Sequence, residues 1–178
     1  MRSDELSGVV IVGVVSDTHL PRFGKTLPSP LMRGLKKAGV QAIVHCGDAT
    51  ERLALDLCAE LAPVYAVAGN NDSKPLQRSL PNRRVLELGS VRIGVVHGHA
   101  GRGRTTMDRA CSAFAEERVD VVLFGHSHIP FRIRRHGVLL FNPGSPTDKR
   151  INPAYTYGVL RISQGRVRAE HRWYLSRK

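Results

Sequence analysis

The 178-residue chain has few cysteines, few aromatic residues and no long apolar run. Its three cysteines, Cys46, Cys58 and Cys111, lie far apart, without the CxxC spacing of a structural zinc site or a paired disulfide framework. No stretch is long enough to cross a bilayer. The apolar run at residues 9–15 lacks the basic flank and cleavage site of a secretory signal. We therefore expect a cytoplasmic protein with no membrane partner.

Lysine and arginine outnumber aspartate and glutamate by 27 to 15, which gives a formal net charge of +12. A basic surface supplies non-specific affinity for nucleic acid. However, the basic residues are spread along the chain, and aromatic residues, at 6%, leave few rings on which bases could stack. The charge therefore indicates attraction to anionic substrates in general. A nucleic-acid partner is possible, but nothing in the composition other than the basic charge supports one.

The length and the hydrophobic content of 42% predict one domain over residues 1–178 with its own apolar core. The sequence contains no repeat, no low-complexity tract and no interdomain linker. It leaves the oligomeric state open, a homo-oligomer included.

Strands and helices alternate in the first part of the predicted fold. The β-branched run at 9–15 predicts a strand buried on both faces. Shorter runs predict four further strands at 41–46, 64–68, 91–96 and 119–124. Helices are expected from Ser29 to Gly39, after a cap at Thr50, and after a capping box at Thr105 and Asp108. Residues 73–82, with two prolines, are predicted to form a connecting loop.

The remaining strands are predicted to pair mostly antiparallel. Turn signals separate strand patterns at 85–88 and 91–96, at 131–135 and 138–142, and at 155–162 and 166–175. In the last strand, apolar and charged residues alternate, which predicts one buried and one wet face.

Polar side chains end each of five predicted strands. They are Asp17 with His19, Asp48, Asn70, His97, and His126 with His128. Ligands bind outside the carboxyl ends of strands in open α/β sheets, so these seven side chains are candidates for one cleft. Each alone has an ordinary explanation, as a helix cap, a turn residue or a core or surface histidine. Their recurrence at five strand ends favours a common site.

The donor types select a class of metal. Imidazole and carboxylate groups with one amide and no thiolate suit Mn, Fe, Zn, Ni or Co better than a structural zinc cage. Seven ligands exceed what one tetrahedral ion needs, so two ions are expected. At a separation of about 3.5–4 Å, one carboxylate should bridge them and a bridging hydroxide becomes a nucleophile near neutral pH.

The ordered motifs resemble the calcineurin-like metallophosphoesterase family. They span residues 11 to about 145 and comprise Asp17-x-His19, Gly47-Asp48, Gly69-Asn70, His97 and Gly125-x-x-His128 with His126. The size, the GNND block at 69–72 and the NPGS block at 142–145 are similar to the small prokaryotic phosphodiesterases of that family. The resemblance implies an α/β fold, a four-layer sandwich of two mixed β-sheets flanked by helices, without a separate cap domain.

The resemblance also implies a ligand set for two divalent transition-metal ions. The first ion would be held by Asp17, His19, Asp48 and His128, and the second by Asp48, Asn70, His97 and His126, with Asp48 as the bridge. Manganese is the expected metal, with nickel, iron, zinc and cobalt as alternatives.

The implied activity is hydrolysis of a small phosphodiester. A metal-bridging hydroxide would attack phosphorus in line, while the ions stabilise the developing charge. Asp48 and Asn70 would belong to the catalytic centre through the ions they hold.

One position departs from the family pattern. Many members have histidine after the asparagine of the GN block, where it positions phosphate or protonates the leaving group, and this chain has Asn71. His99 is the candidate substitute proton donor, and a supporting or solvent-exposed histidine is an equally weighted alternative. Asn71, Arg102 and Arg104 are candidate substrate-phosphate contacts, although solvated loop charges explain the two arginines somewhat better.

Two other functions compete with the phosphodiesterase. One is a protein-binding scaffold like the retromer subunit that resembles this family and has an impaired metal site, against which the full ligand set argues. The other is a nuclease or nucleic-acid-binding module, which rests on the basic charge and the diester chemistry.

Overall fold

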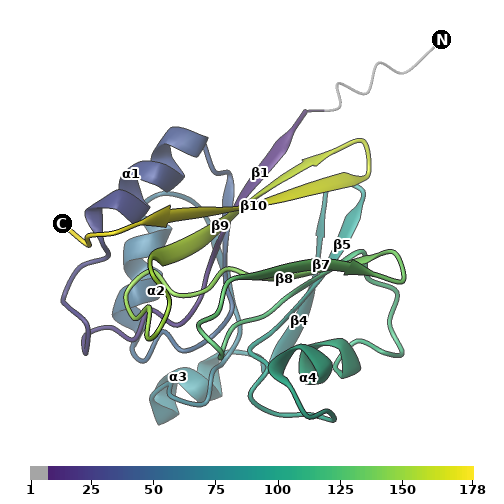
Figure 1. Cartoon of the computed structure of the whole chain (residues 1–178), viewed down its shortest axis with the longest axis horizontal. Coiled ribbons are helices and arrows are strands. Elements are labelled where there is room, and N and C mark those ends of the chain that lie inside the picture. The colour runs from purple at the N-terminus through teal and green to yellow at the C-terminus, as the bar shows by residue number, and fades with distance from the viewer. Residues whose placement is uncertain (1–7) are drawn as a thin grey trace.

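Strand β1 (Val10–Val15) lies at the centre of the first sheet in the computed structural model, which describes residues 8–178 (Figure 1). Its β-branched VIVGVV sequence suits a strand buried on both faces, and its last four residues are fully buried. Residues 1–7, which belong to the predicted domain, lie outside the described part.

The first sheet has the order β10-β9-β1-β2-β3. Strands β2 (Ala42–His45) and β3 (Val64–Ala66) continue it parallel to β1. On the other side, β9 (Tyr155–Ser163) pairs antiparallel with β1, and β10 (Arg166–Tyr174) pairs antiparallel with β9. The C-terminal hairpin thus joins the sheet that the N-terminal strands begin.

The second sheet has the order β4-β5-β6-β8-β7. Its centre is parallel and its two outer pairs are antiparallel, so both sheets are mixed. The strands are β4 (Arg83–Leu88), β5 (Val91–Val96), β6 (Val121–Leu123), β7 (Phe131–Arg135) and β8 (Val138–Asn142).

Three apolar clusters define the layers. One lies between the two sheets and includes Val12, Val44, Ile93 and Phe141. A second packs helices α1 (Ser29–Ala38) and α2 (Arg52–Ala59) on the outer face of the first sheet, and a third packs α4 (Thr106–Ser112) on the outer face of the second. The order helix, sheet, sheet, helix confirms the predicted four-layer sandwich.

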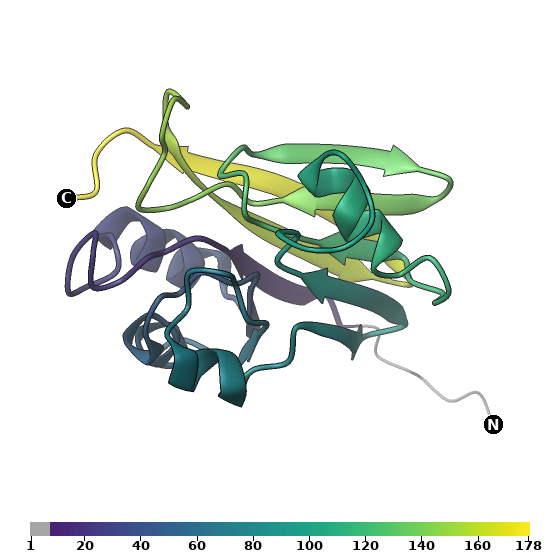
Figure 2. The ribbon, with the colours of Figure 1, turned by 90° about the horizontal axis from the view of Figure 1, so that it is seen from below.

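Helix α3 (Lys74–Ser79) corrects the prediction that residues 73–82 form only a loop. Pro75 stands in its first turn, where the fixed φ of proline is compatible with a helix and its missing N–H costs no hydrogen bond. The buried Leu76 anchors the helix. Figure 2 shows α3 close to α2 and away from α4.

Two smaller predictions are also wrong. Helix α2 is preceded by Glu51 rather than capped by Thr50, because Thr50 has a left-handed φ of 72° and its N–H binds the Asp72 carboxylate. In β10 the alternation fails at its end, where Trp173 is 68% exposed and Tyr174 is buried. Tyr174 instead packs against Tyr155 with stacked rings on the helix-covered face.

The other predicted elements are confirmed within a few residues at their ends. The Thr105–Asp108 capping box of α4 is present, and Gly39 closes α1 in the left-handed conformation. Among residues 8–178, no helix is long and apolar enough to cross a membrane.

His45, the last residue of β2, is only 1% exposed, and its Nε2 lies 3.1 Å from Thr18 Oγ1. Burial, with a smaller effect of His97, lowers the pKa of His45 to about 3. The unfolded chain binds a proton at this ring below pH 6.5, whereas the folded chain stays neutral, so acid destabilises the fold.

We predict that His45→Gln flattens the dependence of metal-free stability on pH. Between pH 6.5 and 5 the wild type should lose about 1.6 kcal/mol through this residue, and the variant should not. Urea unfolding in the presence of a chelator measures the difference, with the exposed His136→Gln as control. Equal slopes for wild type and His45→Gln would contradict the prediction.

Candidate metal centre

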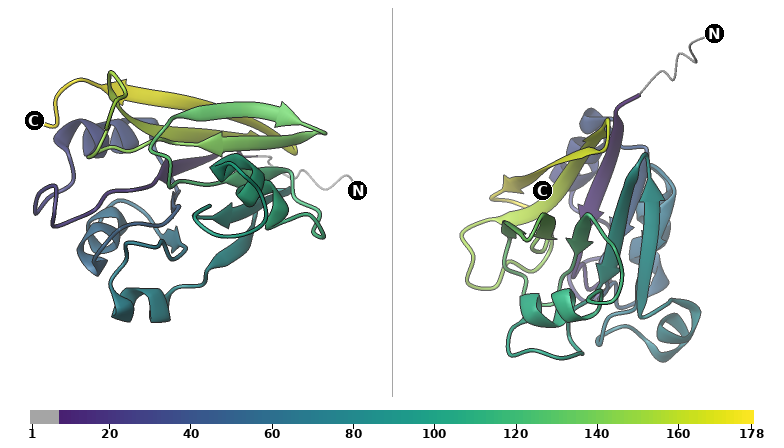
Figure 3. Two further views of the ribbon diagram at one scale, coloured as in Figure 1. Left: turned by 60° about the horizontal axis from the view of Figure 1, so that its bottom comes forward. Right: turned by 90° about the vertical axis from the view of Figure 1, so that its right-hand side faces the viewer.

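The polar residues after β1, β2, β3, β5 and β6 meet at one edge of the two sheets. Backbone hydrogen bonds join the loops, from Asp17 N–H to the Gly47 carbonyl at 3.0 Å and from Gly125 N–H to the His97 carbonyl at 3.1 Å. His97 Nδ1 contacts the Cys46 carbonyl at 2.7 Å and so links the second sheet to the first. Both views in Figure 3 show the two sheets packed together.

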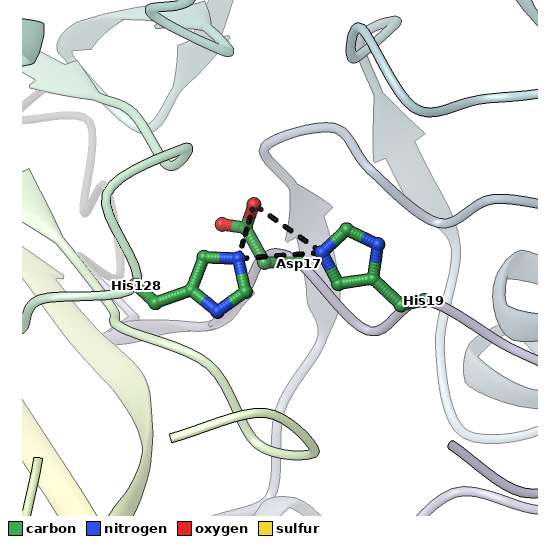
Figure 4. A group of neighbouring side chains, drawn as sticks. All are labelled: Asp17, His19 and His128. Atoms are coloured by element: carbon green, nitrogen blue, oxygen red, sulfur yellow. Dashed lines mark hydrogen bonds and ion pairs between the residues drawn. The ribbon is translucent and has the colours of Figure 1, made fainter. Parts of the chain in front are cut away.

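The first ligand cluster consists of Asp17, His19 and His128 (Figure 4). His19 Nε2 and His128 Nε2 are 3.3 Å apart, and Asp17 Oδ1 lies 3.4 Å from His128 Nε2 and 4.0 Å from His19 Nε2. All three residues are buried. Three donor atoms therefore face one small volume from two different sheets.

The second ligand cluster consists of Asp48, His97 and His126. Asp48 Oδ2 lies 3.2 Å from His97 Nε2. His126 is partly exposed, whereas Asp48 and His97 are buried. The two histidines of the Gly125–His128 turn thus belong to different clusters.

Two carboxylate oxygens connect the clusters. Asp48 Oδ2 is 3.9 Å from His19 Nε2 in the first cluster, and Asp17 Oδ1 is 3.9 Å from His97 Nε2 in the second. The clusters are therefore direct neighbours, as two ions sharing a carboxylate require.

Two buried atoms of these clusters lack hydrogen-bond partners among residues 8–178. They are Asp17 Oδ1 and His97 Nε2. A buried polar atom without a partner is costly unless something else satisfies it. Together with the oxygen and nitrogen donors around them, these atoms fit divalent cations.

The electrostatics of the second cluster show the same need for positive charge. Burial disfavours a charged His97, yet the neighbouring Asp48 and Asp17 carboxylates outweigh burial and raise the pKa of His97 to about 9. His97 and Asn71 likewise hold the pKa of Asp48 below its usual value, against the opposing effect of burial. Without an ion, a proton on His97 balances the carboxylates, and a bound cation would displace it.

Burial lowers the pKa values of His19 and His126, so both rings are neutral at pH 7. Neutral imidazole is the form that binds a metal. These two ligands therefore require no deprotonation near neutral pH.

Five candidate ligands have left-handed backbone conformations. The φ angles lie between 47° and 69° at Asp17, His19, Asp48, His126 and His128. Such conformations are uncommon for residues other than glycine, and they cluster at functional sites, where surrounding contacts compensate for the strain. Here the tight turns aim successive ligands into one volume.

Two glycines permit the close packing of these loops. A side chain at Gly69 would collide with Asp48, and one at Gly125 would collide with Ser16 and Asp17. Both positions lie beside candidate ligands, so the missing Cβ is a requirement of the site.

The model of the calcineurin-like phosphoesterase superfamily domain matches residues 10–165. The chain belongs to this superfamily. A probable metallophosphoesterase of Methanocaldococcus jannaschii is 39% identical over 145 residues, which are 82% of this chain and 72% of that relative. The predicted family is thereby confirmed, and membership in it supports a hydrolase role.

Solved structures share the fold at lower identity. A single mutant of Vps29 from Entamoeba histolytica has a TM-score of 0.75 and 23% identity, and the match covers 93% of this chain and 99% of that chain. An archaeal phosphodiesterase has a TM-score of 0.71 and 22% identity, with 92% and 100% covered. At these identities, both likenesses show the fold alone.

Asn70 and Asn71 of this metallophosphoesterase have different surroundings. Asn70 is exposed, and its side chain forms no hydrogen bond among residues 8–178. Asn71 donates its backbone N–H to Asp48 Oδ1 at 2.8 Å and its side-chain amide to Oδ2 at 2.7 Å. Asn71 therefore holds the Asp48 carboxylate, a contact that the sequence analysis missed.

Asp72 is a second missed residue. Its oxygens accept the N–H groups of Thr50 and Gly69, each at 2.7 Å, and thereby clamp the loops after β2 and β3 together. Its place in the GNND block is the sequence signal that could have identified it as a site residue. Its burial and both of its partners are visible only in the structure.

His99 is exposed and borders the second cluster. The His99 ring centre lies 5.4 Å from that of His97 and 6.3 Å from that of His126. Arg102 and Arg104 lie on an exposed loop, and neither forms an ion pair with a cluster residue. Their assignment to substrate phosphate stays a prediction.

We predict that Asp48→Asn loses metal, because the variant removes a carboxylate that lies within 3.9 Å of histidine nitrogens from both clusters and leaves His97 without its close partner at 3.2 Å. The loss in Mn²⁺ affinity should exceed the about 10- to 100-fold that replacing an outer partner costs. Elemental analysis after dialysis measures metal content, with the exposed Asp56→Asn as the charge-matched control. Two ions retained with activity near wild type would refute the assignment.

Proposed function

We propose that this metallophosphoesterase is a two-metal phosphodiesterase. The observation that carries the proposal is the pair of adjacent, largely buried clusters, with Asp48 Oδ2 within 3.9 Å of histidine nitrogens from both. Two bound divalent cations would supply a water of lowered pKa as the nucleophile and positive charge for the phosphoryl oxygens. Manganese is the metal that we expect.

The protein's own residues hold that arrangement. One ion would be held by Asp17, His19 and His128. The other would be held by His97, His126 and Asn70, and Asp48 would bind both ions. The exposed amide of Asn70 is free to turn toward the second cluster, because it forms no hydrogen bond among residues 8–178.

We expect this centre to hydrolyse diesters faster than monoesters. A phosphodiester carries one negative charge, whereas a monoester carries close to two at neutral pH. The fold shared with an archaeal phosphodiesterase is consistent with this preference.

We also propose that the chain forms one domain without a cap and acts in the cytoplasm. The five ligand-bearing loops belong to the two sheets themselves, and no additional layer covers that edge among residues 8–178. The three cysteines are unpaired, which suits a reducing compartment.

Activity against a panel of phosphodiesters and monoesters with Mn²⁺, Ni²⁺, Fe²⁺, Zn²⁺ or Co²⁺ tests the proposal. We expect chelator-sensitive hydrolysis with a higher kcat/KM for diesters. Metal binding without hydrolysis would favour a protein-binding scaffold, an alternative that the shared fold with Vps29 keeps relevant. Cleavage of DNA or RNA together with salt-dependent binding would instead favour a nuclease.

His99 is the proposed proton donor to the leaving group. Burial, with a smaller effect of His97, lowers its pKa below 6.5, so the acid form is a minority at pH 7 and increases as the pH falls. An alkyl alkoxide leaves poorly without a proton, whereas p-nitrophenolate needs none.

We predict that His99→Ala slows hydrolysis of an alkyl diester by at least about 100-fold and leaves an aryl diester with p-nitrophenolate nearly unchanged. The difference should grow between pH 7 and pH 6. His136→Ala, which changes an exposed histidine in the β7–β8 turn, is the control. An unchanged rate with the alkyl diester would exclude this role.

A further inference from the structure

The His128 ring is held on the side that faces away from the first cluster. Its Nδ1 lies 2.7 Å from the backbone carbonyl of Asp148 and 3.5 Å from Oδ2 of the same residue. A carbonyl only accepts hydrogen bonds, so Nδ1 carries the proton and Nε2 presents its lone pair toward Asp17. One residue thus sets both the tautomer and the orientation of this ligand.

The loop that carries Asp148 is fastened to the backbone beneath the same cluster. Ser145 Oγ donates to the Asp17 carbonyl at 2.8 Å and accepts the N–H of Asp148 at 2.9 Å. Thr147 Oγ1 donates to the Thr18 carbonyl at 2.8 Å. These bonds hold Asp148 in place relative to the strand end that bears Asp17 and His19.

The second cluster lacks such a carboxylate among residues 8–178. His97 Nδ1 contacts only the Cys46 carbonyl, and the His126 ring forms no hydrogen bond. The two clusters therefore differ in how their histidines are supported. The Nδ1 atoms of His97 and His128 both face a backbone carbonyl, and His128 has in addition a carboxylate oxygen 3.5 Å from Nδ1, whose negative charge makes the ring a more basic ligand.

We propose that Asp148 is a positioning residue that selectively strengthens metal binding at the first cluster. The inference rests on the proposed two-metal centre and adds that the support from Asp148 strengthens metal affinity at one cluster and not at the other. The Asp148 side chain is 25% exposed and lies 3.9 Å from Arg150 Nε, so solvent and this cation screen part of its effect. We therefore expect the lower end of the known range, about a tenfold change in affinity.

Asp148→Asn tests the proposal, because it keeps the side-chain size and the backbone carbonyl and removes the carboxylate. Calorimetric titration of chelator-treated full-length protein with Mn²⁺ should show two ions bound, one of them about tenfold more weakly than in wild type. The Tm without metal should equal that of wild type, whereas the rise in Tm on adding Mn²⁺ should be smaller. Asp148→Glu should restore part of the affinity.

Three further variants make the result specific. His128→Ala and His126→Ala identify which binding step belongs to which cluster, and Asp56→Asn controls for loss of one negative charge. Unchanged affinities in Asp148→Asn would overturn the proposal, as would equal weakening of both steps with a lower metal-free Tm. Failure of the wild type to bind Mn²⁺ would overturn the metal centre itself, a result distinct from a defect confined to Asp148→Asn.

Discussion

Two buried carboxylates, Asp17 and Asp48, impose the constraint on which the rest of this structure depends. Burying a negative charge costs several kcal/mol unless it is paired. The histidines around them, with His97 positively charged in the absence of an ion, supply partial compensation. The left-handed turns, the close-packed glycines and the clamp by Asp72 all hold these side chains where a cation can complete the balance.

The two sheets divide the work of building the centre. The first sheet supplies Asp17, His19 and Asp48, and the second supplies His97, His126 and His128. Each cluster therefore combines ligands from both sheets. The apolar cluster between the sheets, which includes Val44, Ile93 and Leu123, sets the distance across which the ligands meet. Packing far from the metal centre thus determines its geometry.

Part of the basic charge has a structural use. Arg132 of β7 donates to the Ala169 carbonyl of β10 at 2.6 Å, and Arg134 donates to the Val167 carbonyl at 3.0 Å. These bonds satisfy the free edge of β10 and join the outer strands of the two sheets, which lie close together in Figure 3. Arginines used in this way contribute less to a nucleic-acid surface than the net charge of +12 suggests.

The sequence alone determined which strands carry the site, and it also identified the family. Their β-branched runs end in a polar motif, and both signals are local. It did not reveal helix α3, because prolines at 75 and 81 resemble loop signals, nor the partners of Asn71, Asp72 and Asp148. Apart from the bond between Asp72 and Gly69, those contacts join residues 20 or more positions apart, such as Asp48 with Asn71 and His128 with Asp148. Only the tertiary structure decided them, because loop paths and sheet packing, rather than local residue patterns, bring such residues together.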